Sequence, residues 1–389
     1  MDRHIAMYIK RLLEGEIRLS LENVPVTAMI GPRQCGKSTL ARHITGEMDN
    51  AVFLDLEKPS DLAKLDNPEW YLSSQKNNLV ILDEIQRKPD LFPLIRSLAD
   101  EWHQNGKFLI LGSASPDLLK QSSESLAGRI SYRKLTPLLW NEISMDYNLE
   151  TYMLRGGFPR SLLNKNDKMS AAWIDDFITT FIERDLLFWA GITPSAMRRL
   201  WQMLAHNNGQ TINYSSLGNS LGASNTTVKN YVDLLEGTYM LEIVPPYYKN
   251  FGKRIVKAPK VYITDNGLTT RLLQLSGFDQ ISGHPVFGSL WEALVLVNLK
   301  GNFRETNCYF FRTSNGAEID FVTELNRKRI AIECKATLSP TLTRGNYSAI
   351  ETIKPDHVFV VAPVDRGWPM TKGVEVVSVN ELIERLRIL

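Results

Sequence analysis

A glycine-rich segment near the amino terminus carries the residue types that bind phosphate. The string Gly31-Pro-Arg-Gln-Cys-Gly-Lys-Ser38 satisfies G-x-x-x-x-G-K-[S/T] and lies between an apolar run and a helical pattern. The backbone N–H groups of such a loop surround a phosphate at the positive end of the following helix. We expect Lys37 to reach the β- and γ-phosphates of ATP and Ser38 to ligate Mg²⁺. The residues expected to contact the nucleotide are Gly31, Pro32, Arg33, Gln34, Cys35, Gly36, Lys37, Ser38 and Thr39.

Two adjacent carboxylates follow the apolar run 79–82. Asp83 is placed to hold the Mg²⁺ shell through water, and Glu84 is placed to polarise the water that attacks the γ-phosphate. Neighbouring acids at the end of a strand are common on protein surfaces. Together with the glycine-rich loop, however, they predict ATP hydrolysis.

Further polar residues are candidates for the same reaction. Ser113 and Ser115 follow the apolar run 108–111 and could orient the attacking water, although Ser115 could equally cap a helix. An arginine beside the γ-phosphate would stabilise charge in the transition state. Arg129 and Arg184 are the candidates, but Arg184 lies between two acids, which is also typical of a structural salt bridge.

A second group of charged residues lies in the last third of the chain. Glu318 and Asp320 open one apolar strand pattern, and Glu333 and Lys335 end the next. Residues two apart in a strand face the same side, so Glu333 and Lys335 should point together into one space beside Asp320. Asp320 and Glu333, with Glu292 on a preceding helix, could bind Mg²⁺ or Mn²⁺, while the lysine positions water or stabilises charge on a phosphate. A salt-bridged sheet face is the alternative.

The middle of the chain predicts a helix-turn-helix. Two helical patterns, 214–221 and 225–236, flank a turn in which Ser224 caps the second helix. The second helix of this motif commonly enters a DNA groove, but here it carries a single cation, Lys229. The basic segment 249–260 could add a hairpin wing that contacts a phosphate backbone. A lid or protein-docking element is the competing interpretation.

The elements that must position these residues suggest three domains. In the first half, short apolar runs alternate with helical patterns, which indicates an α/β fold with a parallel sheet covered by helices on both faces. We predict a P-loop ATPase domain over residues 1–165, a helical connector with a winged-helix-like module over 166–250, and an α/β domain over 251–389. The four predicted strands of the first domain are 26–30, 52–56, 79–82 and 108–111.

Several strings together resemble a known family. The chain looks like the prokaryotic AAA-type ATPases that carry a C-terminal domain of unknown function, and the resemblance covers nearly its whole length. It implies ATP and magnesium, but it says less about the cellular task. Cys35 stands where valine is more usual. The strings that carry the resemblance begin with G-P-R-Q-C-G-K-S-T-L at Gly31 and continue with L-D-E-I-Q at Leu82, G-S-A-S at Gly112, L-A-G-R at Leu126, G-G-F-P at Gly156 and I-E-R-D at Ile182.

The C-terminal charged residues resemble a second family. The order of a helical Glu292, then Asp320, then Glu333-Cys-Lys335 is similar to the PD-(D/E)xK nuclease superfamily, including resolvase-like members. The resemblance implies a restriction-endonuclease-like fold for the C-terminal domain. It does not by itself imply cleavage, because such domains can keep the shape without the activity.

Composition restricts the classes of protein further. The 389 residues are 43% hydrophobic and 23% charged, which is typical of a soluble globular protein. No apolar run reaches the ~18–20 residues that cross a bilayer, and residues 1–20 lack a signal-peptide core, so we expect a cytoplasmic protein without a membrane partner. Three scattered cysteines support neither disulfides nor a zinc cluster. With a net charge of +2, binding to nucleic acid would need a local basic patch.

Two functional hypotheses follow. The first is an ATPase that couples its nucleotide cycle to binding or remodelling DNA, with metal-dependent nuclease activity of the C-terminal domain as a candidate addition. The second is a signalling switch in which ATP gates binding to a protein, without DNA. An arginine that acts on a neighbouring subunit would require a homo-oligomer.

Overall fold

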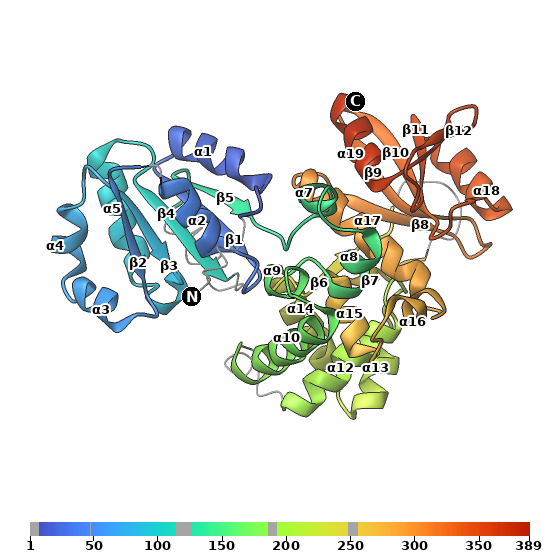
Figure 1. Ribbon diagram of the computed structural model, residues 1–389, viewed down its shortest axis with the longest axis horizontal. Coiled ribbons are helices and arrows are strands. Elements are labelled where there is room, and N and C mark those ends of the chain that lie inside the picture. Colours follow the sequence, from blue (N-terminus) through green and yellow to red (C-terminus); the bar gives the residue numbers. More distant parts are fainter. Residues whose placement is uncertain (1–7, 47, 114–125, 186–192, 248–255) are drawn as a thin grey trace. The chain divides into compact units, whose positions relative to one another are not determined.

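The computed structural model describes residues 8–46, 48–113, 126–185, 193–247 and 256–389. The chain divides into two compact units, residues 1–138 with 237–239 and residues 139–236 with 240–389. Figure 1 colours the first unit from blue to teal and most of the second from green to red. The three-domain division is finer than these two units and stays a prediction.

The first unit is built on a five-stranded sheet in which every described pairing is parallel. The strand order β2-β3-β4-β1-β5 places β1, which leads into the glycine-rich loop, between β4 and β5. Strand β1 is buried along its whole length, which explains its mostly apolar sequence. The strands are β1 (Val26–Gly31), β2 (Ala51–Asp55), β3 (Leu79–Asp83), β4 (Phe108–Ser113) and β5 (Ile130–Lys134).

The sequence located four of these strands to within one or two residues. It missed β5, every residue of which is only half-buried. This strand carries Arg133 and Lys134 and therefore lacks the apolar run by which a buried parallel strand is recognised.

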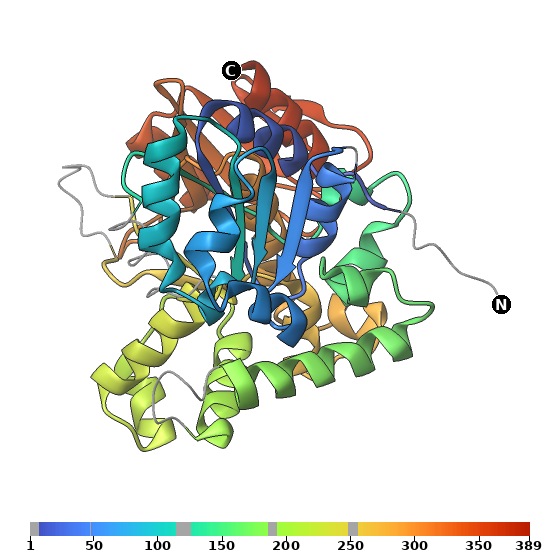
Figure 2. The same cartoon turned by 90° about the vertical axis from the view of Figure 1, so that its left-hand side faces the viewer.

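Helices cover both faces of the sheet in the first unit, as Figure 2 shows. Successive strand residues point to opposite faces, so β1 sends Met29 toward α1 and α2 and Ala28 toward α5. The helices of this unit are α1 (Leu13–Asn23), α2 (Lys37–Thr45), α3 (Pro59–Leu62), α4 (Pro68–Ser73) and α5 (Leu91–Trp102), with short 3₁₀ turns η1 (Ala63–Leu65) and η2 (Ile85–Arg87).

The second unit opens with a helical part. A π-helical turn, η3 (Phe181–Asp185), follows α10, and the aromatic residues Trp173, Phe177 and Phe181 of this region stack in succession. Phe181 also contacts the buried Trp201, so these aromatics belong to the core. The helices are α7 (Trp140–Ile143), α8 (Leu149–Arg155), α9 (Pro159–Leu162), α10 (Asp167–Thr180), α12 (Pro194–His206), α13 (Tyr214–Leu221), α14 (Asn225–Gly237), α15 (Asn266–Leu272) and α16 (Phe278–Ser282).

A six-stranded mixed sheet follows, with strand order β12-β13-β11-β10-β9-β8. Helix α18 (Arg344–Ile353) packs on one face of the sheet. Helices α17 (Phe287–Asn302) and α19 (Val379–Ile388) contact other strands of the sheet. The strands β6 (Leu241–Val244) and β7 (Lys260–Ile263) form a separate antiparallel pair. The sheet contains β8 (Cys308–Arg312), β9 (Glu318–Leu325), β10 (Lys328–Cys334), β11 (His357–Val361), β12 (Trp368–Thr371) and β13 (Val374–Val377).

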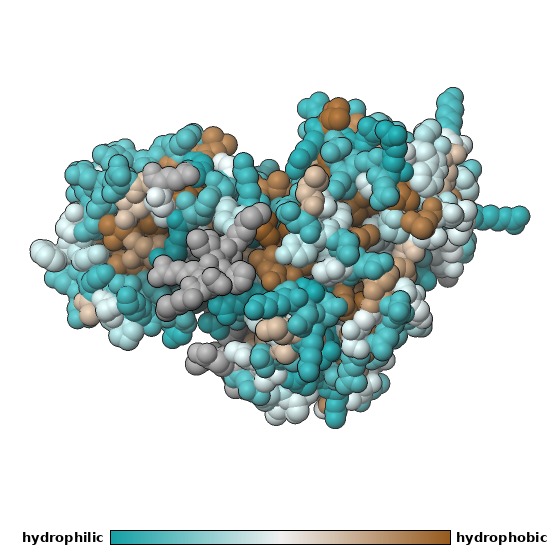
Figure 3. Space-filling view, in the orientation of Figure 1, coloured by the Kyte–Doolittle hydropathy of each residue, from teal (hydrophilic) through white to brown (hydrophobic). Residues whose placement is uncertain are grey.

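In residues 266–302, within the predicted C-terminal α/β domain, three helices, α15, α16 and α17, precede the sheet. Most of α17 is buried, so its sequence is apolar almost all round and lacks the period that identifies a surface helix. Among the described residues, no helix combines the length and apolar character needed to cross a membrane. The space-filling view shows a surface that is mainly hydrophilic with scattered hydrophobic patches (Figure 3).

The G-G-F-P string has a structural role in the second unit. The buried Asp265 carboxylate accepts a hydrogen bond of 2.7 Å from the Gly157 N–H and one of 3.0 Å from the Leu268 N–H. It therefore caps α15 and at the same time holds the turn between α8 and α9. This string marks packing in the second unit.

Candidate nucleotide site and acidic cluster

The glycine-rich loop connects β1 to α2 and requires glycine at both ends. Gly36 adopts φ 103° and ψ 19°, a left-handed conformation that a side chain would strain. At Gly31, an added Cβ would lie 2.1 Å from the Leu135 carbonyl oxygen. The loop is therefore packed directly against the end of β5, which keeps its backbone in place.

Lys37 lies at the start of α2 with only 5% of its surface exposed. Its ammonium donates hydrogen bonds to the carbonyl oxygens of Gly31, at 3.1 Å, and Pro32, at 2.8 Å. Both acceptors are neutral. Phosphate oxygens are charged and form stronger hydrogen bonds with an ammonium, so this lysine can exchange its loop partners for a nucleotide.

Asp83 ends β3 and lies beside the loop. Burial raises the pKa of its carboxyl group and the charge of Glu84 raises it further, while the nearby Ser38 hydroxyl opposes this shift. A buried carboxylate whose charge is disfavoured gains from a nearby cation. Ser38 and Asp83, the two predicted Mg²⁺ ligands, thus lie near each other, and their hard oxygen atoms suit this ion.

Glu84 adopts a left-handed backbone conformation, with φ 58° and ψ 45°. Such a conformation is uncommon in residues other than glycine and often marks a functional position. The Glu84 carboxylate accepts a hydrogen bond from the Gln86 amide, and the Ser113 hydroxyl lies 3.4 Å from the same oxygen. The structure therefore brings Glu84 and Ser113 together, while Ser115 lies outside the described residues.

Gln86 is a residue that sequence reasoning missed. Its amide nitrogen binds Glu84 and lies 3.4 Å from the Ser113 hydroxyl, while its own carbonyl oxygen is buried without a hydrogen-bond partner in the described part of the chain. The signal was present, because Gln86 ends the L-D-E-I-Q string, but no role had been assigned to it.

Arg11 was also missed. This residue precedes α1, is 5% exposed, and donates to the carbonyl oxygens of Cys35 in the loop and of Thr136 and Pro137 after β5. It thus ties the phosphate-binding loop to the segment that leaves the first unit. Its partners are main-chain atoms more than 20 residues away, so no local sequence pattern could reveal them.

The sequence left open whether Arg129 acts within its own subunit, and the structure places it at the end of the sheet opposite the loop of that subunit. The Arg129 carbonyl accepts from the N–H of Val26, at the end of β1 opposite the loop, and its side chain pairs with Asp100. Gly31 lies five positions beyond Val26 along β1, about 16 Å at ~3.3 Å per residue. Arg129 therefore does not reach a γ-phosphate bound by its own loop. The side chain of Arg184 lies outside the described residues.

Four carboxylates gather in the second unit, and we call Glu292, Glu318, Asp320 and Glu333 the acidic cluster. The Lys260 ammonium lies among them, 3.1 Å from Glu318 Oε1, 3.4 Å from Asp320 Oδ1 and 3.7 Å from Glu292 Oε2. Burial by itself lowers the pKa of Lys260, but the three carboxylates outweigh it and raise the pKa above its ordinary value. The lysine is therefore charged.

The other side of the acidic cluster contains Glu333 and Lys335, which do face the same side of β10. The Lys335 ammonium lies 2.7 Å from Glu333 Oε1, while Glu333 Oε2 is buried without a hydrogen-bond partner in the described residues. Burial raises the pKa of Glu333, and the charge of Asp320 raises it further. No three or more His, Cys, Asp or Glu side chains among the described residues form a group that could hold a metal ion.

The predicted helix-turn-helix corresponds to α13 and α14. The Ser224 hydroxyl accepts from the Thr227 N–H at 3.1 Å, as expected of a helix cap, and Thr226, Lys229 and Asn230 are exposed on α14. Residues 248–255 of the expected wing lie outside the described part of the chain. Lys260, counted among the wing cations, is wrong for that role because only 3% of its side chain is exposed.

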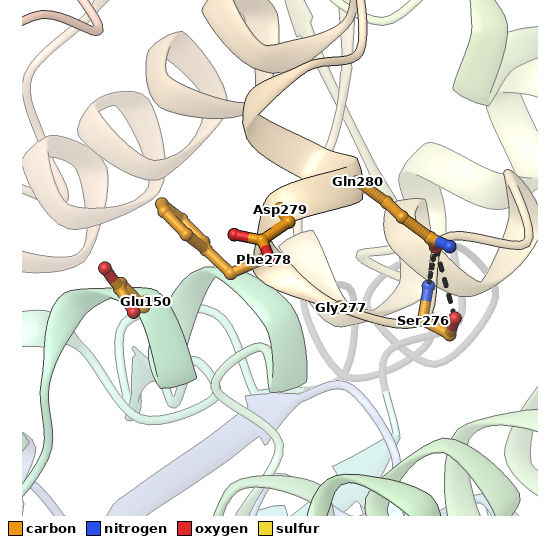
Figure 4. Close-up of a pocket in the computed structure, with 6 residues that line it drawn as sticks. All are labelled: Glu150, Ser276, Gly277, Phe278, Asp279 and Gln280. Carbon is orange, nitrogen blue, oxygen red and sulfur yellow. Dashed lines mark hydrogen bonds between the residues drawn. The ribbon is translucent and has the colours of Figure 1, made fainter.

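A hollow of about 370 Å³ also lies in the second unit, beside α8 and α16 (Figure 4). Gln280 accepts hydrogen bonds there from the Ser276 N–H and hydroxyl, at 2.9 and 3.1 Å. Apart from these groups its polar side chains come from Glu150 and Asp279, and none of the predicted site residues lines it.

Comparison with known proteins shows which families and proteins this chain is similar to. Residues 23–144 match an AAA domain family, so the first unit contains an AAA-type P-loop ATPase domain. Residues 146–279 and 287–382 match two families described as domains of unknown function, DUF8612 and DUF4143.

Whole-chain relatives are found in bacteria. The uncharacterized protein Rv2008c of Mycobacterium tuberculosis is 36% identical over 375 residues, which cover 96% of this chain and 84% of that protein. An uncharacterized protein of Haemophilus influenzae is 26% identical over 285 residues, covering 65% of this chain and 70% of its own length. Among solved structures, the Walker-type ATPase PABY2304 of Pyrococcus abyssi is 17% identical, with a TM-score of 0.47, covering 68% of this chain and 96% of that one.

Proposed function

This chain belongs to the same family as Rv2008c of Mycobacterium tuberculosis, and from that premise we propose that its first unit binds and hydrolyses ATP, with Glu84 activating the attacking water. The observation that carries the proposal is the meeting of two strand ends at the glycine-rich loop. Lys37 and Ser38 follow the loop after β1, while Asp83 ends β3 and Glu84 follows it, and Ser38 lies near enough to Asp83 to affect its pKa. This is the set of groups that phosphoryl transfer to water requires.

Each residue has a distinct task in this reaction. The loop N–H groups and Lys37 bind the phosphates, and Ser38 and Asp83 would hold Mg²⁺, which neutralises charge on the β- and γ-phosphates when bound. Glu84 accepts the proton of the attacking water. Gln86 and Ser113, which contact the Glu84 carboxylate, hold it in position.

We infer that the nucleotide cycle is coupled to DNA through α14. The capped α14 exposes Thr226, Lys229 and Asn230, side chains that can contact base edges and phosphate. Binding would be weak and salt-dependent, because this helix offers one cation. A protein-binding switch is the second candidate, and the burial of Lys260 favours it, since that burial removes a cation from the surface expected to face a phosphate backbone.

The catalytic proposal is tested by Glu84→Gln. The variant should bind ATP as the unaltered chain does, because the amide keeps the shape of the side chain, but its turnover should fall about 10²–10⁴-fold for lack of a general base. Nucleotide titration and phosphate release measure the two effects separately. Glu101→Gln, an exposed glutamate on α5, is the matched control. Undiminished turnover in Glu84→Gln would remove Glu84 from the mechanism.

The DNA component is tested by ATP turnover with and without duplex DNA, at about 50 and about 200 mM salt. We expect DNA to stimulate turnover at the lower salt only. Lys229→Ala should lose this stimulation, while Lys168→Ala, an exposed lysine on α10, should keep it. ATP turnover that is unchanged by DNA at both salt concentrations would instead support the protein-binding switch.

A further inference from the structure

The position of Lys260 assigns a different role to the acidic cluster from the one that the sequence suggested. We propose that the Lys260 ammonium is the resident cation of this cluster and takes the place that a divalent metal ion would occupy in a nuclease, so that the cluster joins two segments of the chain. Lys260 Nζ lies within 3.1–3.7 Å of oxygens from Glu318, Asp320 and Glu292. A positive charge thus already stands where these carboxylates converge.

The oxygen atoms that a metal would need are engaged. Asp320 Oδ1 faces Lys260, and Asp320 Oδ2 accepts from the Cys334 N–H at 2.9 Å. Glu292 Oε2 accepts from the Tyr262 hydroxyl at 2.7 Å. Because Mg²⁺ requires its oxygens at about 2.0–2.1 Å, an ion among the same oxygens would lie next to an ammonium and be repelled by it.

Lys260 is also held in place. Its side chain is 3% exposed, and its main chain pairs with Val244 of β6 and bridges to Thr211. The ammonium lies 5.6 Å from the centre of the Phe310 ring. Moving it out of the cluster would leave three carboxylates without a counter-charge in a largely buried site, which is strongly unfavourable.

One feature resembles a metal site, namely the unpartnered Glu333 Oε2. The other oxygen of this carboxylate is bound to Lys335, and Asp320 is engaged by Lys260 and Cys334. Mg²⁺ in proteins usually binds one or two carboxylates and completes its shell with water. Here both oxygens of Asp320 and one oxygen of Glu333 are engaged by the protein. The groups present therefore do not fit a metal.

The same geometry explains what the cluster does. Lys260 belongs to the segment that matches one family, residues 146–279, whereas the four carboxylates belong to the segment that matches the other, residues 287–382. A buried ammonium from β7 thus enters an acidic cluster built by α17, β9 and β10. An ion pair of this kind fixes one arrangement of two segments, because displacing either partner leaves a buried charge unpaired.

The test measures Mn²⁺ binding without nucleotide by the loss of the free-ion signal in electron paramagnetic resonance. The unaltered chain and its Asp320→Asn variant should show the same weak binding, because Asp320 is neutralised by Lys260. Lys260→Met removes the ammonium and keeps the length of the side chain. This variant should bind about one Mn²⁺ per chain at least ~10-fold more tightly, since the repulsion is gone.

The added binding must depend on the acidic cluster, so the double variant Lys260→Met with Asp320→Asn should return to the level of the unaltered chain. Lys372→Met, an exposed lysine of the same unit, is the matched control. Stoichiometric Mn²⁺ binding by the unaltered chain that is lost in Asp320→Asn or Glu333→Gln would overturn the proposal. That comparison needs only the unaltered chain and these two variants, so it decides the matter even if Lys260→Met does not fold. ATP turnover does not enter either comparison, so failure here leaves the proposed ATPase function untouched.

Discussion

Two buried lysines in this chain stand in opposite surroundings. Lys37 of the first unit donates to the neutral carbonyls of Gly31 and Pro32, whereas Lys260 of the second unit lies among three carboxylates. Both side chains are almost fully buried, at 5% and 3% exposure. The two lysines are almost equally buried, so they differ in the groups that their ammonium contacts.

The carboxylates of the two regions also differ in whether they form an ion pair. Asp83 and Glu84 form no ion pair among the described residues, and the Glu84 carboxylate is held by the neutral Gln86 amide. Asp320 and Glu292 lie beside Lys260, which compensates their negative charge. A site whose charges are kept apart and bonded to neutral groups can bind a charged ligand. A site whose charges are paired internally holds the fold together instead.

The largest effect is expected of Lys37→Ala, which tests whether Lys37 binds nucleotide. ATP binding should weaken more than about 100-fold, because the charge-assisted bonds to the β- and γ-phosphates are lost. The free energy of unfolding should fall by only about 1–2 kcal/mol, since two neutral carbonyls lose a partner. Nucleotide titration and chemical denaturation measure the two effects, with Lys76→Ala as an exposed control. Retained ATP affinity would show that Lys37 is as structural as Lys260.

The reverse pattern is expected of Lys260→Met. The second unit should lose about 3–5 kcal/mol of stability, because buried carboxylates are left without their cation. ATP affinity should stay the same, since the acidic cluster belongs to a different compact unit from the glycine-rich loop. Chemical denaturation of this variant beside Lys372→Met checks the prediction. A stability equal to that of the control would mean that Lys260 contributes nothing to joining the two segments.

A smaller effect is expected of Gln86→Leu, which tests whether Gln86 positions Glu84 in the first unit. Loss of the amide that binds Glu84 should reduce turnover about 10-fold, because one hydrogen bond to a charged group contributes about 1.5–3 kcal/mol. ATP affinity should remain, which distinguishes loss of positioning from loss of the nucleotide site. Gln75→Leu, which precedes the opposite end of β3, provides the control. Equal turnover in both variants would exclude a positioning role for Gln86.

The sequence predicted local features well and long-range partners poorly. Strands β1 to β4 and the loop after β1 follow from apolar runs, glycines and the spacing of Lys37 and Ser38, all of which lie within short stretches. Strand β5 was missed because no residue in it is fully buried. The sequence could not place Arg129 relative to the loop, because the pattern A-G-R does not tell which end of the sheet it occupies. Only the three-dimensional structure shows which end it is, through the hydrogen bond from the Val26 N–H to the Arg129 carbonyl.

The sequence by itself determined that Lys37, Ser38, Asp83 and Glu84 stand at the same edge of one sheet, because a parallel α/β fold brings the carboxyl ends of its strands to one edge. Only the tertiary structure decided what Lys260 does. Its three carboxylate partners lie 32, 58 and 60 positions further along the chain, at Glu292, Glu318 and Asp320. Electrostatic partners are chosen by distance in space, and sequence patterns of a few residues carry no information about it.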